Sequence, residues 1–220
     1  MFNKISQTAF EEMQIEAGIL LLNFDPANPV EPADADIICA TTGGITVNCQ
    51  PSFSDWAKDV DNAKDGMMEF KHLDGWDCNI QVTALGTDPA LIKLALGCAD
   101  IDSNDATKIK PRWNVKLTDF NDSIWFVGEK ANGGLVVCQL LHALSTGGFS
   151  LKTTKNGKGQ ISITISGHPS VNDQDTVPMQ FWSTPGTEEE EGGTEGGGTA
   201  GGGTAGGGTA GGGTEGGGNG

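Results

Sequence analysis

Short apolar runs separated by turn residues fill the chain up to about residue 185. Apolar and polar residues alternate within most runs, and Gly, Asp, Asn or Pro bounds them, which is typical of β-strands. We expect strands at residues 16–24, 36–41, 45–50, 68–73, 77–85, 109–117, 125–129, 135–144, 149–154, 160–167 and 177–182. The pattern therefore predicts an all-β fold, an antiparallel β-sandwich or partial barrel.

One short helix is predicted beside the strands. Asp88 can accept hydrogen bonds from the amides of a first helical turn, Pro89 suits the first helical position, and residues 91–96 supply an apolar stripe. Gly97 can end the helix in the left-handed conformation. We expect this helix to cover one face of the sheet.

Turn signals give further expectations. Residues 42–44, Thr-Gly-Gly, look like a hairpin turn between the second and third strands, and Thr8 with Glu11 fits a capping box. Residues 25–35, which contain three prolines, and residues 54–66, which are rich in aspartate, read as long loops. Loops of this length in a small domain are usually functional or disordered.

The hairpin around Asn156 allows a test of register. A three-residue loop at 156–158 segregates apolar from polar side chains, whereas a two-residue turn mixes them. The predicted pairs are Phe149 with Ile165, Leu151 with Ile163 and Thr153 with Ile161. The opposite face is then rich in hydroxyls and nearly uncharged, with Ser150, Lys152, Thr154, Gln160, Ser162 and Thr164.

The end of the chain has a different composition. Of the 34 glycines, 19 lie at or after Gly186, and from Thr194 a threonine recurs at every fifth position. Nothing in this segment can bury enough surface to offset the entropy lost on ordering glycine, so we expect a flexible acidic tail. The predicted organisation is an N-terminal arm at 1–15, a β domain at 16–186 and a low-complexity tail at 187–220.

Charge and cysteine usage exclude several classes of protein. The 220 residues carry 29 acidic and 13 basic side chains, and Arg112 is the only arginine, so sequence-specific DNA binding is not expected. The longest apolar run, residues 17–24, is too short to span a bilayer, and the first residues do not resemble an export signal. The five cysteines lie far apart among apolar neighbours, so we expect buried free thiols in a reducing cytoplasm.

Catalytic and metal-binding patterns are not found in the sequence. The three histidines are isolated, and residues 100–111 begin like a calcium loop but have Asp105 and Pro111 where glycine and glutamate are required. We therefore expect no enzyme activity, no cofactor and no metal.

The only concentration of basic residues gives a hypothesis about assembly. On a strand, Lys108, Lys110 and Arg112 would project from one face. This face is either solvated or meets an acidic loop of a neighbouring copy, for which the 54–66 loop offers Asp55, Asp59 and Asp61.

Three long strings carry a resemblance to a known family. They are ATTGGITVNCQPSFSDWAKDVDNA, HLDGWDCNIQVTALGT and GGLVVCQLLHALSTGGFSLKTTKNGKGQISITISGHPS, followed by DTVPMQFW. Over residues 16–182 the chain resembles the major tail protein, or tail tube protein, of long-tailed bacteriophages and prophages of Gram-positive hosts. The glycine-rich tail departs from the usual pattern of that family.

The resemblance implies a fold and a function. It implies two packed sheets whose strands join those of neighbouring copies in hexameric rings, and rings that stack into the conduit for DNA ejection. A long loop and the termini would reach adjacent subunits. The implied partners are further copies of the chain and the tail terminator, tape-measure and distal tail proteins. The implied location is the virion tail, with the host cytoplasm during assembly.

The charge balance agrees with such a conduit, because a wall of hydroxyls does not hold the DNA that passes it. The alternative is a secreted β-sandwich binding module with a glycine-rich linker, against which five unpaired cysteines and the missing export signal count. A hydrolase built on a β-sandwich is a third possibility, but the sequence contains no constellation of acidic and basic groups that could catalyse hydrolysis. A related injection tube would give nearly the same sequence pattern.

Overall fold

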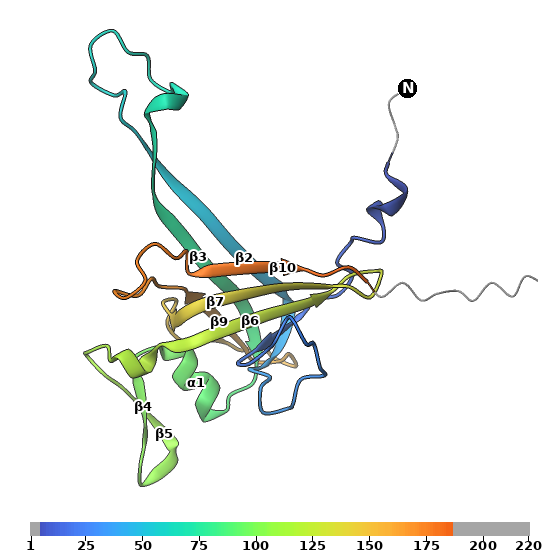
Figure 1. The fold of residues 1–220 in the computed structure, drawn as a ribbon. Coiled ribbons are helices and arrows are strands. Elements are labelled where there is room, and N and C mark those ends of the chain that lie inside the picture. The colour runs from blue at the N-terminus through green and yellow to red at the C-terminus, as the bar shows by residue number, and fades with distance from the viewer. Residues whose placement is uncertain (1–4, 187–220) are drawn as a thin grey trace, which may run out of the picture. The chain divides into compact units, whose positions relative to one another are not determined.

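The computed structural model describes residues 5–186 and shows an all-β fold with one α-helix (Figure 1). The described residues all belong to one compact unit, and the whole of the predicted tail, residues 187–220, lies outside them. The strands are β1 (Ile19–Leu21), β2 (Ala40–Asp55), β3 (Lys71–Leu85), β4 (Ala99–Asp102), β5 (Asp105–Pro111), β6 (Asn121–Glu129), β7 (Leu135–Ser145), β8 (Ser150–Lys152), β9 (Gln160–Ser166) and β10 (Met179–Ser183).

Two antiparallel layers enclose the core, and β7 joins them. In one layer β7 pairs with β6 and β10, and β1 extends β6; in the other β9 pairs with β8 and β3, and β2 extends β3. The end of β7 pairs with the end of β9. Fully buried side chains from both layers pack together between them, among them Leu20, Ile124, Leu140, Ile80, Ile161 and Ile165. The predicted antiparallel sandwich or partial barrel is therefore confirmed.

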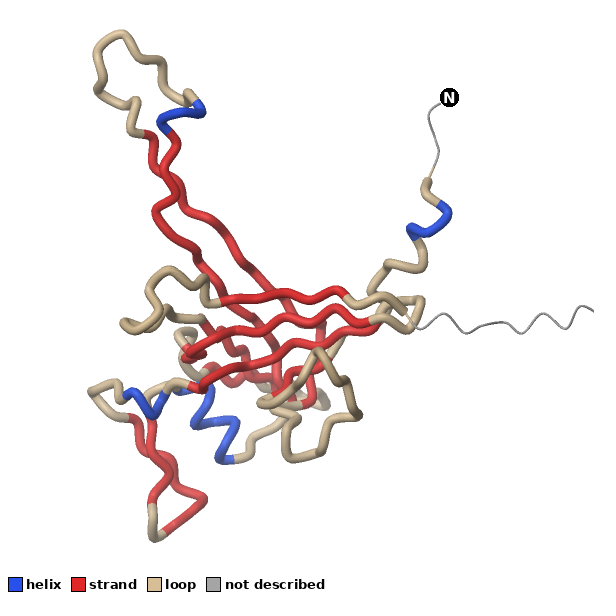
Figure 2. Tube along the Cα trace, in the orientation of Figure 1, coloured by secondary structure: helices blue, strands red, loops and turns tan. Residues whose placement is uncertain are grey.

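The predicted helix is α1 (Pro89–Leu96). The Asp88 side chain accepts a hydrogen bond from the Leu91 amide at 2.9 Å, as expected of a cap, and Gly97 ends the helix at φ 71°. Leu91 and Ala95 are buried in the main core. The helix lies beside the β4–β5 hairpin (Figures 1 and 2). Among the described residues, α1 is the only α-helix. No helix in this part of the chain has the length and apolarity required to cross a membrane.

The turn predicted at residues 42–44 is wrong. Thr41 pairs with Ala84 and Ile45 with Val82, so the chain continues along the same partner as a single strand, β2. Gly43 and Gly44 have φ values of 77° and 83°, and they form a bulge in β2 rather than a reversal of the chain. Two predicted short strands are therefore parts of one strand of 16 residues.

Other predicted boundaries also differ. The strand predicted at 109–117 ends at Pro111, which has no N–H to continue the ladder. The strand predicted at 68–73 begins with a 3₁₀ turn, Met68–Phe70, before β3. The first helical turn, Gln7–Ala9, is capped by Ser6 instead of by Thr8 with Glu11.

The hairpin of β8 and β9 keeps the predicted faces in a different register. Leu151 pairs with Ile161 and Ser150 with Ser162, so the pairing is displaced by two residues from the predicted one. A shift of two leaves each side chain on the same face. The loop is longer than predicted, and its turn contains Asn156 at φ 61° with the Gly157 amide donating to the Thr154 carbonyl at 3.0 Å.

Candidate functional site

The solvent side of the β8–β9–β3–β2 layer is almost entirely polar and nearly uncharged. Strand alternation directs Ile161, Ile163 and Ile165 into the core, and Ser162 and Thr164 to the other side. We call this solvent side the amide–hydroxyl face. It consists of Thr46, Asn48, Gln50, Asp77, Asn79, Gln81, Thr83, Ser150, Lys152, Gln160, Ser162, Thr164 and Ser166.

The strand register arranges these residues in rows across the layer. One row runs Ser166, Asn79 and Asn48, and the next runs Thr164, Gln81 and Thr46. A third row begins with Ser150, Ser162 and Thr83 and then reaches the Gly43–Gly44 bulge, where β2 contributes no side chain beyond hydrogen. Directly opposed residues of neighbouring strands lie within contact distance, so each row is continuous.

Side-chain hydrogen bonds join the amides within the face. The Asn79 Oδ1 atom accepts from Asn48 Nδ2 at 3.0 Å and from Gln81 Nε2 at 3.3 Å, and Asn79 Nδ2 donates to Asp77 Oδ1 at 3.3 Å. Beside them the hydroxyls of Thr146 and Ser166 lie 2.8 Å apart. These bonds hold the amides in place without adding charge.

The charge of the face contrasts with that of the whole chain. Only Asp77 and Lys152 are ionisable, and their charges cancel, whereas the full sequence has a formal net charge of −16. Serine, threonine and amide side chains offer both donors and acceptors but no fixed charge. The face therefore has little electrostatic attraction or repulsion for a polyanion.

Five of the six side chains predicted from the sequence for this face lie in β8 or β9: Ser150, Lys152, Gln160, Ser162 and Thr164. Thr154 lies beyond β8 in the turn with Asn156 and Gly157. The half of the face that β2 and β3 contribute was missed. The alternation of Thr46, Asn48 and Gln50 with apolar residues was the available signal, but its pairing partner was not evident.

The β2–β3 hairpin extends beyond the core, and its tip is organised by Asp55. The carboxylate accepts from the Ala57 amide at 3.0 Å and the Gly66 amide at 2.6 Å, and it pairs with Lys71 at 3.2 Å. These contacts, led by the Ala57 amide, lower the pKa of Asp55. Of the acidic residues predicted for assembly, Asp55 is thus bound within its own chain, while Asp59 and Asp61 are exposed.

Apolar side chains are exposed along the far half of this hairpin. They are Phe53, Trp56, Val60, Met67, Met68, Leu73 and Trp76. Trp56 stacks on His72 with ring centroids 4.3 Å apart, but the pair is still exposed. Figure 1 shows the hairpin as the long teal projection from the two layers. Clusters of exposed apolar residues of this kind mark protein contact sites.

The β4–β5 hairpin carries the basic residues predicted for assembly, and Arg112 lies at its base. The guanidinium pairs with Asp100 at 2.7 Å and with Asp119, and it donates to the Asn114 carbonyl at 2.8 Å. Burial acts to raise the pKa of Asp119, but the Lys116 amide and Arg112 outweigh it, so the pKa is lowered. Arg112 therefore stabilises its own hairpin.

The other two predicted cations lie on the exposed part of this hairpin. Lys110 pairs with Asp102 and lowers the pKa of that carboxyl group, while Lys108 has no ion pair among the described residues. The loop that follows Arg112 presents Trp113, Val115 and Leu117 to solvent. The hairpin thus combines exposed cations with exposed apolar side chains.

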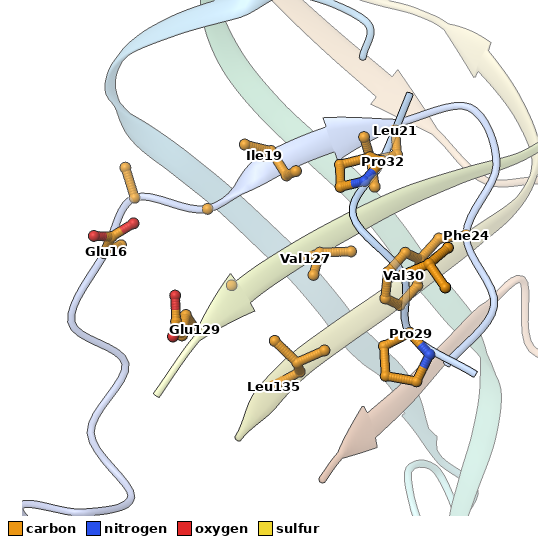
Figure 3. A pocket seen from close by; sticks show the side chains of 13 residues that line it. Glu16, Ile19, Leu21, Phe24, Pro29, Val30, Pro32, Val127, Glu129 and Leu135 are labelled. Atoms are coloured by element: carbon orange, nitrogen blue, oxygen red, sulfur yellow. The ribbon is translucent and has the colours of Figure 1, made fainter. Parts of the chain in front are cut away.

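The outer side of the other layer carries a second apolar cluster under the 25–35 loop. Trp125 packs against Trp182 and Phe24, with centroid distances of 5.4 and 6.1 Å. Between this loop and the ends of β1, β6 and β7 lies a groove of about 420 Å³ (Figure 3). Its walls are apolar except for Glu16 and Glu129. Residues 5–186 contain no group of His, Cys, Asp and Glu side chains arranged to hold a metal.

No protein-family model and no curated protein matches the chain. Several solved chains are similar to it, and two of them are described here. One is the tail of an empty gene transfer agent (GTA) particle with C6 symmetry, at 10% identity and a TM-score of 0.38, covering 76% of this chain and 96% of that chain. The other is the virion of a native GTA particle, at 9% identity and a TM-score of 0.35, covering 76% of this chain and 95% of that chain.

Proposed function

We propose that this protein is the structural subunit of a phage-type tail tube, assembled in the host cytoplasm and located in the virion tail. Copies join in rings, the rings stack, and the amide–hydroxyl face lines the channel through which DNA leaves. The observation that supports this proposal most strongly is the amide–hydroxyl face, which spans four strands and has only two charged side chains although the protein is strongly acidic. A channel for DNA needs a wall that neither binds nor repels phosphates strongly.

The strand edges support joining of copies side by side. Within the described residues the β8–β9–β3–β2 layer ends at β2 on one side and at β8 on the other, and neither outer edge is paired. Unpaired strand edges are templates for pairing with another chain, and closing them in a ring removes them. We propose that β2 of one copy pairs with β8 of the next, which continues the amide–hydroxyl face around the ring. The hexameric number comes from the family resemblance.

The two projecting hairpins support stacking of rings. The β2–β3 tip exposes Asp59 and Asp61 among apolar side chains, and the β4–β5 hairpin exposes Lys108 and Lys110 beside Trp113. The exposed carboxylates of the tip can pair with the exposed ammonium groups of the other hairpin, and both surfaces expose apolar side chains, so we propose that the tip of one copy contacts a neighbouring copy here. Arg112 and Asp55 are left out of this contact because partners in their own chain leave their side chains only 13% and 20% exposed, whereas Lys110, although paired with Asp102, is 57% exposed. The terminator, tape-measure and distal tail proteins would bind the ends of such a tube.

Electron microscopy of the concentrated purified chain tests the proposal. We expect hollow tubes or rings whose channel wall, after image reconstruction, is formed by β2, β3, β8 and β9. A monodisperse monomer at all concentrations would contradict the tube and favour a binding module. A tube whose channel is lined by the outer side of the β6–β7 layer would contradict the assignment of the amide–hydroxyl face.

Adding positive charge to the amide–hydroxyl face is expected to trap DNA in the tube. In the variant Ser162→Lys with Thr164→Lys, each subunit gains two cations on the proposed wall. We expect tubes formed with short duplex DNA to retain it in nuclease-resistant form, and salt to release it, because each phosphate contact adds a counterion-release contribution. The measurement is nuclease protection of labelled DNA that sediments with the tubes.

The matched control places the same charge elsewhere. Asn172→Lys with Gln174→Lys adds two cations at exposed positions in the loop between β9 and β10, outside both projecting hairpins. DNA bound by this control should remain sensitive to nuclease. Equal protection in the two variants, or none in the wall variant once its tubes are shown to form, would contradict the proposed wall.

A further inference from the structure

Two cysteines face each other across the two strands of the β2–β3 hairpin. Cys49 in β2 and Cys78 in β3 are directly opposed in the register, and their Sγ atoms lie 3.1 Å apart. A disulfide bond is about 2.05 Å long, so the two atoms need to approach by only about 1 Å. All five cysteines of the chain are free thiols in this structure.

The surroundings of the pair favour the thiol form and protect it. Cys78 is buried in the main core and Cys49 is half-buried beside it. Burial, together with the contact to Cys49, raises the pKa of Cys78 to about 12, and burial raises the pKa of the nearby Cys138 to about 12. Thiolates are the reactive species, so oxidation at neutral pH must be slow.

A disulfide bond between Cys49 and Cys78 would join the two strands at the base of the projecting hairpin. The next opposed pair on the same face of the hairpin is Pro51 and Trp76. Trp76 is already exposed, so the cysteines form the last core layer before the hairpin leaves the two layers. A bond between residues 29 apart in sequence would close the whole outer part of the hairpin into a loop. Closing such a loop restricts the unfolded hairpin and holds its two strands together.

We propose that Cys49 and Cys78 are a disulfide-forming pair that remains reduced during assembly in the cytoplasm and is oxidised after the protein leaves it. The oxidant is a low-molecular-weight disulfide. The Cys49 thiolate attacks one sulfur of that disulfide, releases one thiol and forms a mixed disulfide. The Cys78 thiolate then attacks Cys49 Sγ and releases the second thiol. One external disulfide is thus reduced to two thiols, and the two cysteines lose two protons and two electrons to form one bond.

The biological setting of this inference rests on the proposed function, but its chemistry does not. If the β2–β3 tip joins neighbouring rings, a bond at its base prevents the strands from separating under load. The test uses the purified chain with oxidised glutathione and needs no tubes. Failure of the cross-link and failure of tube assembly are therefore separate outcomes.

The first measurement counts and maps thiols. After incubation of the native chain with oxidised glutathione and alkylation, we expect the number of free thiols to fall from five to three, with no glutathione retained. Tandem mass spectrometry should show a peptide that links Cys49 to Cys78. The rate should rise about tenfold per pH unit near neutrality, because the thiolate fraction rises tenfold per unit below the pKa.

The second measurement uses the exposed lysines of the tip, Lys58 and Lys64, which lie within the loop that the bond would close. Limited trypsin cleavage there should leave oxidised protein joined on a non-reducing denaturing gel and separated on a reducing gel. Cys49→Ser, at a half-buried position, should abolish the link, and Cys39→Ser should retain it. Five free thiols after prolonged oxidation of the native chain, or a link that joins Cys138 to either partner, would overturn the proposal.

Discussion

Replacement of Arg112 by alanine is expected to destabilise the protein by about 3 kcal/mol, because removing one partner of a buried ion pair leaves the other charge uncompensated. The Arg112 side chain is 13% exposed and that of Asp119 is 3% exposed. The variant loses the pairs with Asp100 and Asp119 and the hydrogen bond to the Asn114 carbonyl. Urea unfolding at neutral pH, followed by tryptophan fluorescence and circular dichroism, measures the change.

Two further variants separate the guanidinium geometry from its charge. Arg112→Lys keeps a cation but cannot reach three acceptors with one planar group, so an intermediate loss of stability is expected. Lys108→Ala removes an exposed cation of the same hairpin and should change the free energy of unfolding by less than about 0.5 kcal/mol. A similar small effect for Arg112→Ala would show that the ion pairs of the hairpin do not stabilise the fold.

Charging the apolar tip of the β2–β3 hairpin is expected to abolish tube formation without unfolding the chain. In the variant Val60→Asp with Met68→Asp, both side chains are exposed in the isolated chain, at 47% and 81%, so the fold should be retained. If these residues are buried between copies, two unpaired carboxylates would be desolvated there. A loss of about 3 kcal/mol per contact corresponds to a rise of about a hundredfold in the critical concentration for assembly.

Sedimentation across a concentration series gives the critical concentration, and circular dichroism gives the fold. Val171→Asp with Asn172→Asp is the matched control, since it adds the same two negative charges at exposed positions outside the hairpin, where Val171 is 84% exposed. Normal tubes of the tip variant would remove the β2–β3 hairpin from the proposed ring contacts. Loss of tubes in both variants would point to net charge instead of to the tip.

The sequence contained enough local information for the strands that alternate strongly and for the helix. β9 was predicted because Ile161, Ile163 and Ile165 alternate with hydroxyl residues, and α1 because Asp88 and Gly97 mark its ends. The bulge at Gly43–Gly44 was not predictable in the same way. Two glycines with positive φ fit a turn as well as a bulge, and only the pairing of both flanks with β3 distinguishes the two.

Half of the amide–hydroxyl face followed from sequence and half did not. The hydroxyls of Ser162 and Thr164 were identified because β8 and β9 are neighbours in the chain, so their pairing is local. Asn48 and Asn79 meet across strands of the long hairpin, whose register depends on two irregularities, at residues 41–45 and at residues 52–53. The ion pairs of Arg112 were missed for a related reason, because Asp100 lies in β4 and Asp119 lies in the 3₁₀ turn that follows the hairpin.

The glycine bulge in β2 influences the curvature of the amide–hydroxyl face, whereas the polar side chains determine its chemistry. No atom lies within 4 Å of where a Cβ would stand on Gly43 or Gly44, so glycine is required there by the backbone angle and not by crowding. A D-amino acid would satisfy that angle, whereas an L-residue would oppose it. Bulges bend a strand and increase its twist, so the curvature of this layer depends on the positive φ angles that glycine allows at positions 43 and 44. Substitutions among the serines, threonines and amides can then alter how the surface is wetted without altering how it curves.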